Sequence, residues 1–291
     1  MRLARFFFVL HLAALAFGVG GLIIALPHPE LWSGSPMGAA VFRFGMQRTG
    51  SLYIVLGAAT MLTLGLGRLG PWRTMLFFIL ATVLPLGAEL LGTGTGWPFG
   101  AYSYTDGLGL KILGRVPFTV PLSWFYMGFT SYLLATRVVE RWARKPRPWQ
   151  AVLLGAWLLT AWDLVLDPAM ASPALPVRFW IWHQSGPYFG MPLTNLAGWS
   201  ATGLIFIGLS RILWRTDAPL ASLSTWLPFG VYTANIAFAM ALSLSVGLWP
   251  AAVAALLLGV GPAALTFKLP SALQRWSSPG HLRVSKPPVT S

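Results

Sequence analysis

The sequence contains no cysteine and few charged residues. Without cysteine the chain can form no disulfide, and it offers no thiol nucleophile, thiolate metal site or cysteine-bound iron–sulfur cluster. Charged residues make up 9% of its 291 residues and hydrophobic residues 56%, with a mean hydropathy of +0.67. A soluble domain needs more polar residues than this to cover its surface. The composition therefore predicts an integral membrane protein.

Acidic residues are scarcer than basic ones. Seven Asp and Glu residues stand against twenty Lys and Arg residues, which gives a formal net charge of +13. Such an excess can mark a nucleic-acid-binding protein, but a basic nucleic-acid-binding domain would not be this apolar. In a membrane protein, basic residues instead concentrate in cytoplasmic loops. We therefore expect the chain to sit in a lipid bilayer and to bind no nucleic acid.

Motifs for metals and common cofactors are also missing. The four histidines lack the paired i, i+4 spacing of a metal site; they are His11, His28, His183 and His281. The glycines within residues 92–100 match neither G-x-G-x-x-G nor a P-loop, and this stretch carries no basic residue to hold phosphate. We therefore predict no metal and no cofactor.

Hydrophobic runs long enough to cross about 30 Å of hydrocarbon recur along the chain. They predict eight helices, at residues 5–26, 50–69, 72–92, 116–136, 149–166, 193–214, 223–244 and 247–268. The first run follows Arg2 and Arg5 as a signal peptide would, but it is longer than one and no small-residue cleavage site follows, so we expect a retained helix. The predicted fold is an all-α polytopic membrane helix bundle, with one transmembrane domain over residues 1–270. Residues 271–291, rich in Ser and Pro, are expected to form a disordered cytoplasmic tail.

The basic residues orient this bundle. With both termini in the cytoplasm, fifteen of the twenty Lys and Arg residues fall on the cytoplasmic side and five fall outside. The same orientation gathers five of the seven acidic residues at the outer end; they are Glu30, Glu89, Asp106, Asp163 and Asp167. Any chemistry is therefore expected in the outer half of the bundle.

The stretch AWDLVLDPAM, residues 161–170, places two aspartates four positions apart in an otherwise apolar helix. A charge at membrane depth costs at least about 2.5 kcal/mol, and two like charges at i and i+4 also repel. Pro168 predicts that the helix stops at Asp167. Burial and mutual repulsion then predict that at least one of the two acids keeps its proton, and so can donate it. The alternative is that both acids only hold helices together through hydrogen bonds.

A third acid, Glu89, lies near the outer end of its helix, before a connection rich in glycine and aromatic residues. It is a second candidate catalytic group, or else a buried glutamate that fixes the helix end. The glycines after it are expected to let a non-helical loop re-enter the bundle, with Trp97, Phe99, Tyr102 and Tyr104 as interfacial aromatics.

A second polar connection, residues 179–199, contains His183 and Asn195. His183 is a candidate catalyst or an ordinary interfacial histidine. Asn195 is a candidate for orienting water or the N-cap of the helix that follows. The sequence leaves both alternatives open.

Four ordered segments resemble the membrane-bound carotenoid biosynthesis hydratases, a family that includes carotenoid 1′,2′-hydratases and bisanhydrobacterioruberin hydratase. The segments are GAELLGTGTGWPFGAYSYT (87–105), VPFTVPLSW (116–124), AWDLVLDPAM (161–170) and WIWHQSGPYFGMPLTNLAGW (180–199). The resemblance implies addition of water across the terminal 1,2 double bond of an acyclic ψ-end, giving a tertiary hydroxyl. The implied partners are water and an acyclic or monocyclic carotenoid that is lycopene- or γ-carotene-like.

The residues suit this reaction, which needs a proton at C2, a stabilised tertiary cation at C1 and a water molecule to capture it. The candidate catalytic residues are Asp163, Asp167, Glu89, His183 and Asn195. Aromatic faces stabilise a cation without attacking it. The candidate substrate-binding residues are therefore Trp97, Phe99, Tyr102, Trp162, Trp182, Tyr188 and Trp199.

Two other functions fit the same features. A carotenoid end-group cyclase, such as a lycopene cyclase, also begins by protonating this alkene, and exclusion of water decides between the two products. A membrane transporter or lipid-binding protein would instead use the acids to relay protons or bind a cation. Inverted repeats would favour a transporter, and the sequence shows none by inspection.

Overall fold

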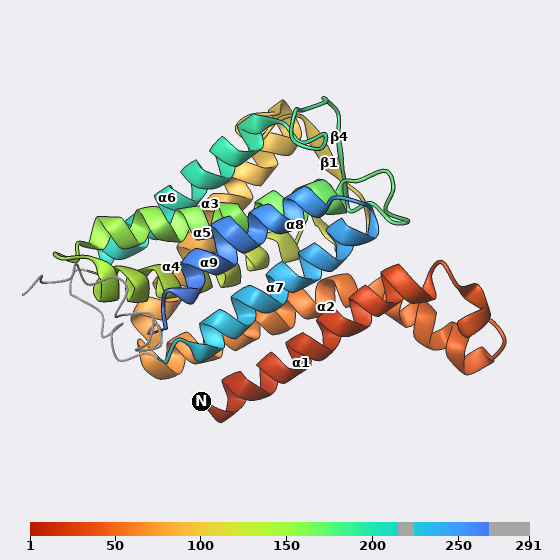
Figure 1. The fold of residues 1–291 in the computed structure, drawn as a ribbon, viewed down its shortest axis with the longest axis horizontal. Coiled ribbons are helices and arrows are strands. Elements are labelled where there is room, and N and C mark those ends of the chain that lie inside the picture. Colours follow the sequence, from red (N-terminus) through yellow and green to blue (C-terminus); the bar gives the residue numbers. More distant parts are fainter. Residues whose placement is uncertain (215–223, 268–291) are drawn as a thin grey trace, which may run out of the picture.

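The computed structural model describes residues 1–214 and 224–267, and most of these residues are helical (Figure 1). The helices before residue 214 are α1 (Arg2–Val19), the π-helical η1 (Gly20–Ala25) that continues it, the short 3-10 helix η2 (Pro29–Leu31), α2 (Pro36–Arg68), α3 (Pro71–Thr95), α4 (Thr119–Trp142), α5 (Pro148–Met170) and α6 (Leu193–Leu213). After the gap come α7 (Trp226–Ser245) and one last helix, made of α8 (Trp249–Ala255), the π-helical η4 (Leu256–Val260) and α9 (Gly261–Ala264). The predicted all-α polytopic bundle is confirmed. The tail expected at residues 271–291 lies outside the described residues.

Not all of these helices look like membrane spans by themselves. Six described helices are long and apolar enough to cross a membrane: α1 with η1, α2, α3, α5, α6 and α7. Helix α4 has 24 residues but a more polar sequence. It contacts α2, α3, α5, α6 and α7, and these neighbours shield it from lipid. A helix surrounded by protein does not need an apolar surface on every side, so α4 completes the bundle from within. The last helix, Trp249–Ala264, is shorter than the others.

Proline and glycine set several of the helix boundaries. Proline stands in the first turn of α2, α3, α5 and α8, where its missing N–H costs nothing. Helix α2 begins well before the predicted residue 50, because Ser35 caps it by accepting a 2.9 Å hydrogen bond from Gly38 N. The glycines after Glu89 do not begin a loop as expected. Helix α3 runs through Gly92 and Gly94 to Thr95, and Gly96, whose φ is +82°, terminates it.

The predicted end of α5 at Asp167 is wrong, since the helix continues through Pro168 to Met170. Proline lacks the N–H that would bond to the carbonyl oxygen four residues earlier, at Leu164. The hydroxyl of Tyr188 replaces it, donating a 3.0 Å hydrogen bond to Leu164 O. A side chain from a distant loop therefore compensates for the proline, and both aspartates stay in helical backbone.

The two polar connections meet in a small antiparallel ribbon. Strand β1 (Tyr102–Tyr104) pairs with β4 (Trp180–Trp182), so that Tyr102 faces Trp182 and Tyr104 faces Trp180. A second pair, β2 (Lys111–Ile112) with β3 (Val116–Pro117), leads into α4. The β1–β4 ribbon lies at the end of the bundle away from the N-terminus (Figure 1).

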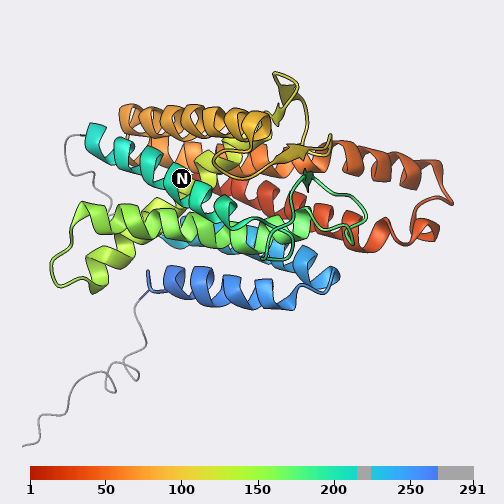
Figure 2. The ribbon, with the colours of Figure 1, turned by 90° about the horizontal axis from the view of Figure 1, so that it is seen from above.

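A buried polar cluster fastens α1 to the bundle. His11 Nδ1 donates a 2.7 Å hydrogen bond to Tyr53 O of α2, and Asn235 Nδ2 of α7 lies 3.1 Å from His11 Nε2. Tyr126 of α4 donates to Asn235 Oδ1 at 2.7 Å. Because polar groups in a membrane bundle need partners, this cluster fixes four helices relative to one another. Seen from above, α3 and the last helix lie on opposite sides of the bundle (Figure 2).

The two ends of the bundle differ in the residues they carry. At one end Arg68 Nε lies 3.3 Å from Met1 Sδ, and Arg141 donates to Thr266 O. The start of α1, the end of α2, the end of α4 and the last described residues therefore share this end. The β1–β4 ribbon and the three intramembrane acids occupy the other.

We predict that the end with Met1 and Arg141 faces the cytoplasm, because basic residues are retained on that side. Reporter fusions at either terminus should be active as cytoplasmic fusions, and a reporter inserted near Gly114 should be extracytoplasmic. An extracytoplasmic C-terminal reporter would contradict this orientation.

Candidate active site

Three buried carboxyl groups from two helices meet beneath the β1–β4 ribbon. Glu89 is in the last two turns of α3, and Asp163 and Asp167 are in the last turns of α5. Their exposed fractions are 3%, 1% and 3%. All three line one cavity of about 40 Å³. A cavity of this size holds a water molecule or two, since one water needs at least about 10–15 Å³.

The ribbon supplies the donors that satisfy two of these acids. Side chains alternate between the faces of a strand, so Tyr102, Tyr104, Trp180 and Trp182 share the face toward the acids. Burial raises the pKa of Tyr102 and of Tyr104 well above the ordinary value for a tyrosine, and the negative charge of Glu89 raises both further. Both tyrosines are therefore neutral O–H donors.

Glu89 accepts three hydrogen bonds. Its Oε2 accepts from the hydroxyls of Tyr102 and Tyr104, the latter at 2.9 Å, and its Oε1 accepts from Trp124 Nε1 of α4 at 2.9 Å. Both oxygens thus face donors, an arrangement that favours a carboxylate.

Asp167 has an equally complete set of donors. Its Oδ1 accepts from Trp180 Nε1 at 2.7 Å and from Trp182 Nε1 at 3.1 Å. Its Oδ2 accepts from Asn195 Nδ2 at 2.6 Å. Asn195 is the third residue of α6 rather than its N-cap, and its side chain points to the acids.

Asp163 differs from the other two acids. Among the described residues it accepts one hydrogen bond, through Oδ2 from Asn195 Nδ2 at 2.8 Å. The same amide nitrogen therefore bridges Asp163 and Asp167, which brings the two carboxyl groups together. Asp163 has the fewest donors of the three, so it is the acid best suited to keep a proton.

Aromatic rings form the rest of the cavity wall. Trp199 of α6 lines the cavity and stacks on Trp124, with ring centroids 3.9 Å apart. Trp162 is buried against the edge of Trp199, at 5.8 Å between centroids, but does not line the cavity. Phe99 also lines it, and its ring packs where a side chain on Gly198 would clash, since a Cβ there would lie 2.6 Å from Phe99.

The other candidates from the sequence lie outside the cavity. His183 is exposed and its Nε2 lies 2.9 Å from Ser103 Oγ, on the far face of the ribbon from the acids. Trp97 is 69% exposed. Tyr188 contacts α5 through the hydrogen bond to Leu164 described above.

The sequence did not single out Trp124, Trp180 or Tyr104 as site residues, although each contacts an acid. The aromatic-x-aromatic patterns YSY (102–104) and WIW (180–182) are a signal that could have found two of them. Two short strands with aromatic residues at alternate positions present all of those rings on one face.

The cavity holds acids without basic partners. None of its ten lining residues is Lys, Arg or His. Across residues 1–214 and 224–267, no group of three or more His, Cys, Asp or Glu side chains could hold a metal ion. Carboxyl groups in such a cavity can donate a proton when neutral and can stabilise nearby positive charge when ionised.

Comparison with known proteins places this site in a described family. The model of the family described as "Carotenoid biosynthesis protein" matches residues 49–262, which include every residue that lines the cavity. Bisanhydrobacterioruberin hydratase of Haloarcula japonica is 33% identical over 135 residues, which cover 46% of this chain and 44% of that protein. The match thus spans less than half of that relative's length. No solved structure matches the chain.

Proposed function

Since the chain belongs to the carotenoid biosynthesis protein family, we propose that it is a carotenoid hydratase. It adds water across the terminal 1,2 double bond of an acyclic ψ-end and gives a tertiary 1-hydroxyl, with no change in oxidation state. The substrate is a lycopene- or γ-carotene-like carotenoid, and the protein's own acids do the chemistry without a cofactor. The similarity to a protein named as a hydratase supports this class of reaction.

The observation that carries the proposal is the meeting of three carboxyl groups and aromatic rings around a cavity of about 40 Å³. Hydration of an alkene requires an acid, a surface that tolerates a cation, and room for water. A purely structural cluster of hydrogen-bonded acids would not need the space between them.

Asp163 is the proton donor in this proposal. It accepts one hydrogen bond, whereas Asp167 and Glu89 each accept three. The two aspartates share one proton, held on Asp163. Asp163 transfers this proton to C2 of the alkene, whose π electrons form the new C–H bond and leave a tertiary cation at C1.

The cavity wall stabilises that cation. The rings of Trp199 and Phe99 present π faces, and the carboxylates of Asp167 and Glu89 add negative charge in a site that lacks basic residues. The carboxylates are held by N–H and O–H donors, so they contribute charge without forming a bond to C1.

Water held by Glu89 then attacks C1 through its oxygen lone pair. The proton that this water loses returns to the aspartate pair, with Asp167 as the first acceptor and Asp163 as the final one. The sum of the steps is alkene plus water giving alcohol, and the enzyme returns to its starting protonation state.

We expect expression of this chain in a lycopene- or γ-carotene-producing host to yield a carotenoid whose mass has increased by one water. Mass spectrometry of the extracted pigments measures this directly, and the host with empty vector is the control. A new pigment of unchanged mass would indicate cyclisation instead, and no new pigment from either substrate would contradict the proposal.

A further inference from the structure

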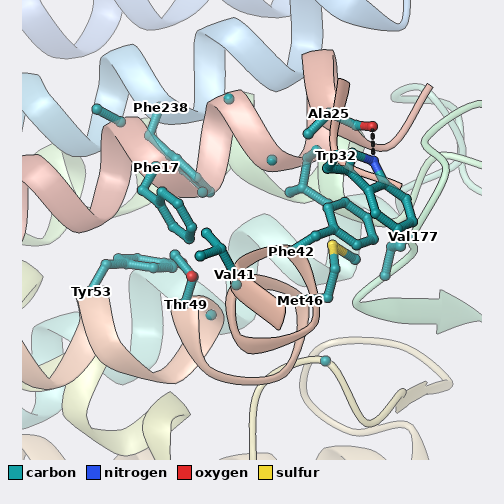
Figure 3. Close-up of a pocket in the computed structure, with 18 of the residues that line it drawn as sticks. Phe17, Ala25, Trp32, Val41, Phe42, Met46, Thr49, Tyr53, Val177 and Phe238 are labelled. Atoms are coloured by element: carbon teal, nitrogen blue, oxygen red, sulfur yellow. Dashed lines mark hydrogen bonds between the residues drawn. The ribbon is translucent and has the colours of Figure 1, made fainter. Parts of the chain in front are cut away.

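A second and much larger hollow lies between α1 and α2, on the side of the bundle away from α3. Its volume is about 570 Å³. Figure 3 shows it walled by the end of α1, by Trp32 in the α1–α2 connection, by the first half of α2 and by Phe238 of α7. Val177 and Phe179, which precede β4, also line it. We refer to this hollow as the α1–α2 cleft.

The lining of the α1–α2 cleft is mostly apolar and uncharged. No Asp, Glu, Lys, Arg or His lines it, six of its residues are aromatic and seven are glycines. Trp32 and Phe42 stack with their centroids 3.9 Å apart and their planes 5° apart, which makes one wall planar (Figure 3). A rigid, conjugated chain can lie closely against this planar wall.

The two hollows differ in what they can hold. The cavity between the acids, at about 40 Å³, holds a water molecule or two and is far too small for a long isoprenoid. The cleft, at about 570 Å³, is within the range of about 300–1,000 Å³ that is usual for small-molecule sites.

The two hollows are also neighbours. Phe179 lines the cleft and the next residue, Trp180, lines the acid cavity. Phe179 extends the pairing of β4 with β1, since Thr105 N donates to Phe179 O at 2.9 Å. Successive side chains of an extended strand point to opposite faces, so the cleft and the cavity lie back to back across this strand.

We infer that the α1–α2 cleft binds the isoprenoid chain of the substrate, whose end passes around β4 to reach the carboxyl groups. This inference rests on the proposed function for the identity of the ligand. A phospholipid is a poorer fit, because the cleft offers no charged residue for a headgroup.

Two substitutions add bulk to the cleft. A Cβ added at Gly21 meets no atom within 4 Å, so Gly21→Leu introduces a side chain at the cleft without a clash. Val41→Trp enlarges an exposed side chain of the cleft wall. Gly67→Leu in α2 is the matched control, because a Cβ there also meets nothing within 4 Å and the residue lies outside the cleft.

The experiment purifies each full-length variant from a host that makes an acyclic carotenoid. Carotenoid and phospholipid that remain bound are measured per chain, and pigment conversion is measured in the same cells. We expect Gly21→Leu and Val41→Trp each to reduce the amount of carotenoid bound per chain, and the conversion of pigment, at least fivefold. Gly67→Leu should match the wild type in both measurements. Asp163→Asn should retain bound carotenoid while it loses conversion.

The outcomes separate this inference from the proposed function. If both cleft variants retain as much carotenoid as the wild type, or if the wild type retains phospholipid alone, the cleft is not the binding site. If the cleft variants lose bound carotenoid but no chain converts it, the cleft assignment stands and the hydratase proposal fails. Size-exclusion profiles of the purified variants establish that any loss is not due to misfolding.

Discussion

Replacing Asp163 with Asn is expected to abolish hydration. Proton transfer creates the cation, and Asn keeps the shape and the acceptor for Asn195 Nδ2 but cannot supply the proton. Loss of a general acid typically costs about 10²–10⁴-fold in rate. Conversion in a pigment-producing host should therefore fall below detection, while the amount of protein in the membrane stays near that of the wild type.

Asp106→Asn is the matched control for this substitution. Asp106 lies at the same end of the bundle, but its side chain is 96% exposed and pairs with Lys111 at the surface. Exposed ion pairs contribute little to stability, so this variant should convert carotenoid normally. If both Asp163→Asn and Asp167→Asn also convert normally, the aspartates are structural.

Asp167→Asn should abolish hydration as well, but with an added effect on folding. In the variant, Oδ1 of residue 167 can still accept from the two tryptophans. Its NH₂ group, however, takes the place of Oδ2, the atom that accepts from Asn195 Nδ2 in the wild type. Two donors then oppose each other, and an unpaired buried donor costs about 1–3 kcal/mol. Lower membrane levels of this variant than of Asp163→Asn would separate the two roles of the pair.

Much of the fold could be predicted because hydrophobic length and basic residues are local properties of the sequence. The end of α5 could not, since it depends on the Tyr188 hydroxyl reaching Leu164 O from 24 residues away. The length of α2 was underestimated for a related reason. Its first half carries Arg43 and Arg48 and does not read as a membrane span, yet a capping serine and a proline begin the helix there.

The acids of the site could be predicted because a carboxyl group in an apolar helix is costly and therefore informative. Their partners could not, because the chain has fifteen tryptophans and the sequence does not tell which of them face an acid. Trp180 and Trp182 contact Asp167 only because β4 pairs with β1, a pairing between residues about eighty positions apart. His183 directly follows Trp182 in the same segment, yet its side chain falls on the opposite face of that ribbon.

The ribbon also explains how the bundle tolerates three buried acids. Each strand delivers its donors to a different acid, the tyrosines of β1 to Glu89 and the tryptophans of β4 to Asp167. The strand pairing therefore fixes the distance between the group proposed to hold water and the group proposed to receive its proton. Among the described residues Asp163 accepts a hydrogen bond from Asn195 alone. It is therefore the acid of the three that is best suited to keep a proton.

Glu89→Gln is expected to lower hydration severely, by about 10- to 100-fold, while leaving residual product. Water is the nucleophile, and it can still reach the cation when the residue that positions it is changed, whereas no cation forms without the acid. The glutamine oxygen can accept from Trp124 Nε1, and its amide can donate to the hydroxyls of Tyr102 and Tyr104, which can turn because a hydroxyl both donates and accepts. The variant should therefore fold, and its bound carotenoid should match that of the wild type.

Glu89→Leu is the contrasting variant, because it leaves the same three donors buried without an acceptor. Each lost partner costs about 1–3 kcal/mol, so this protein should be scarce in the membrane rather than merely slow. Conversion per folded chain, measured for both variants beside Asp163→Asn, distinguishes positioning from structure. Wild-type conversion by Glu89→Gln would remove Glu89 from the mechanism, and complete loss with carotenoid still bound would make it essential to the proton transfer itself. Residual product from Glu89→Gln and none from Asp163→Asn is the order that the geometry predicts, since Asp163 makes the cation whereas Glu89 adds negative charge near it and guides the water that captures it.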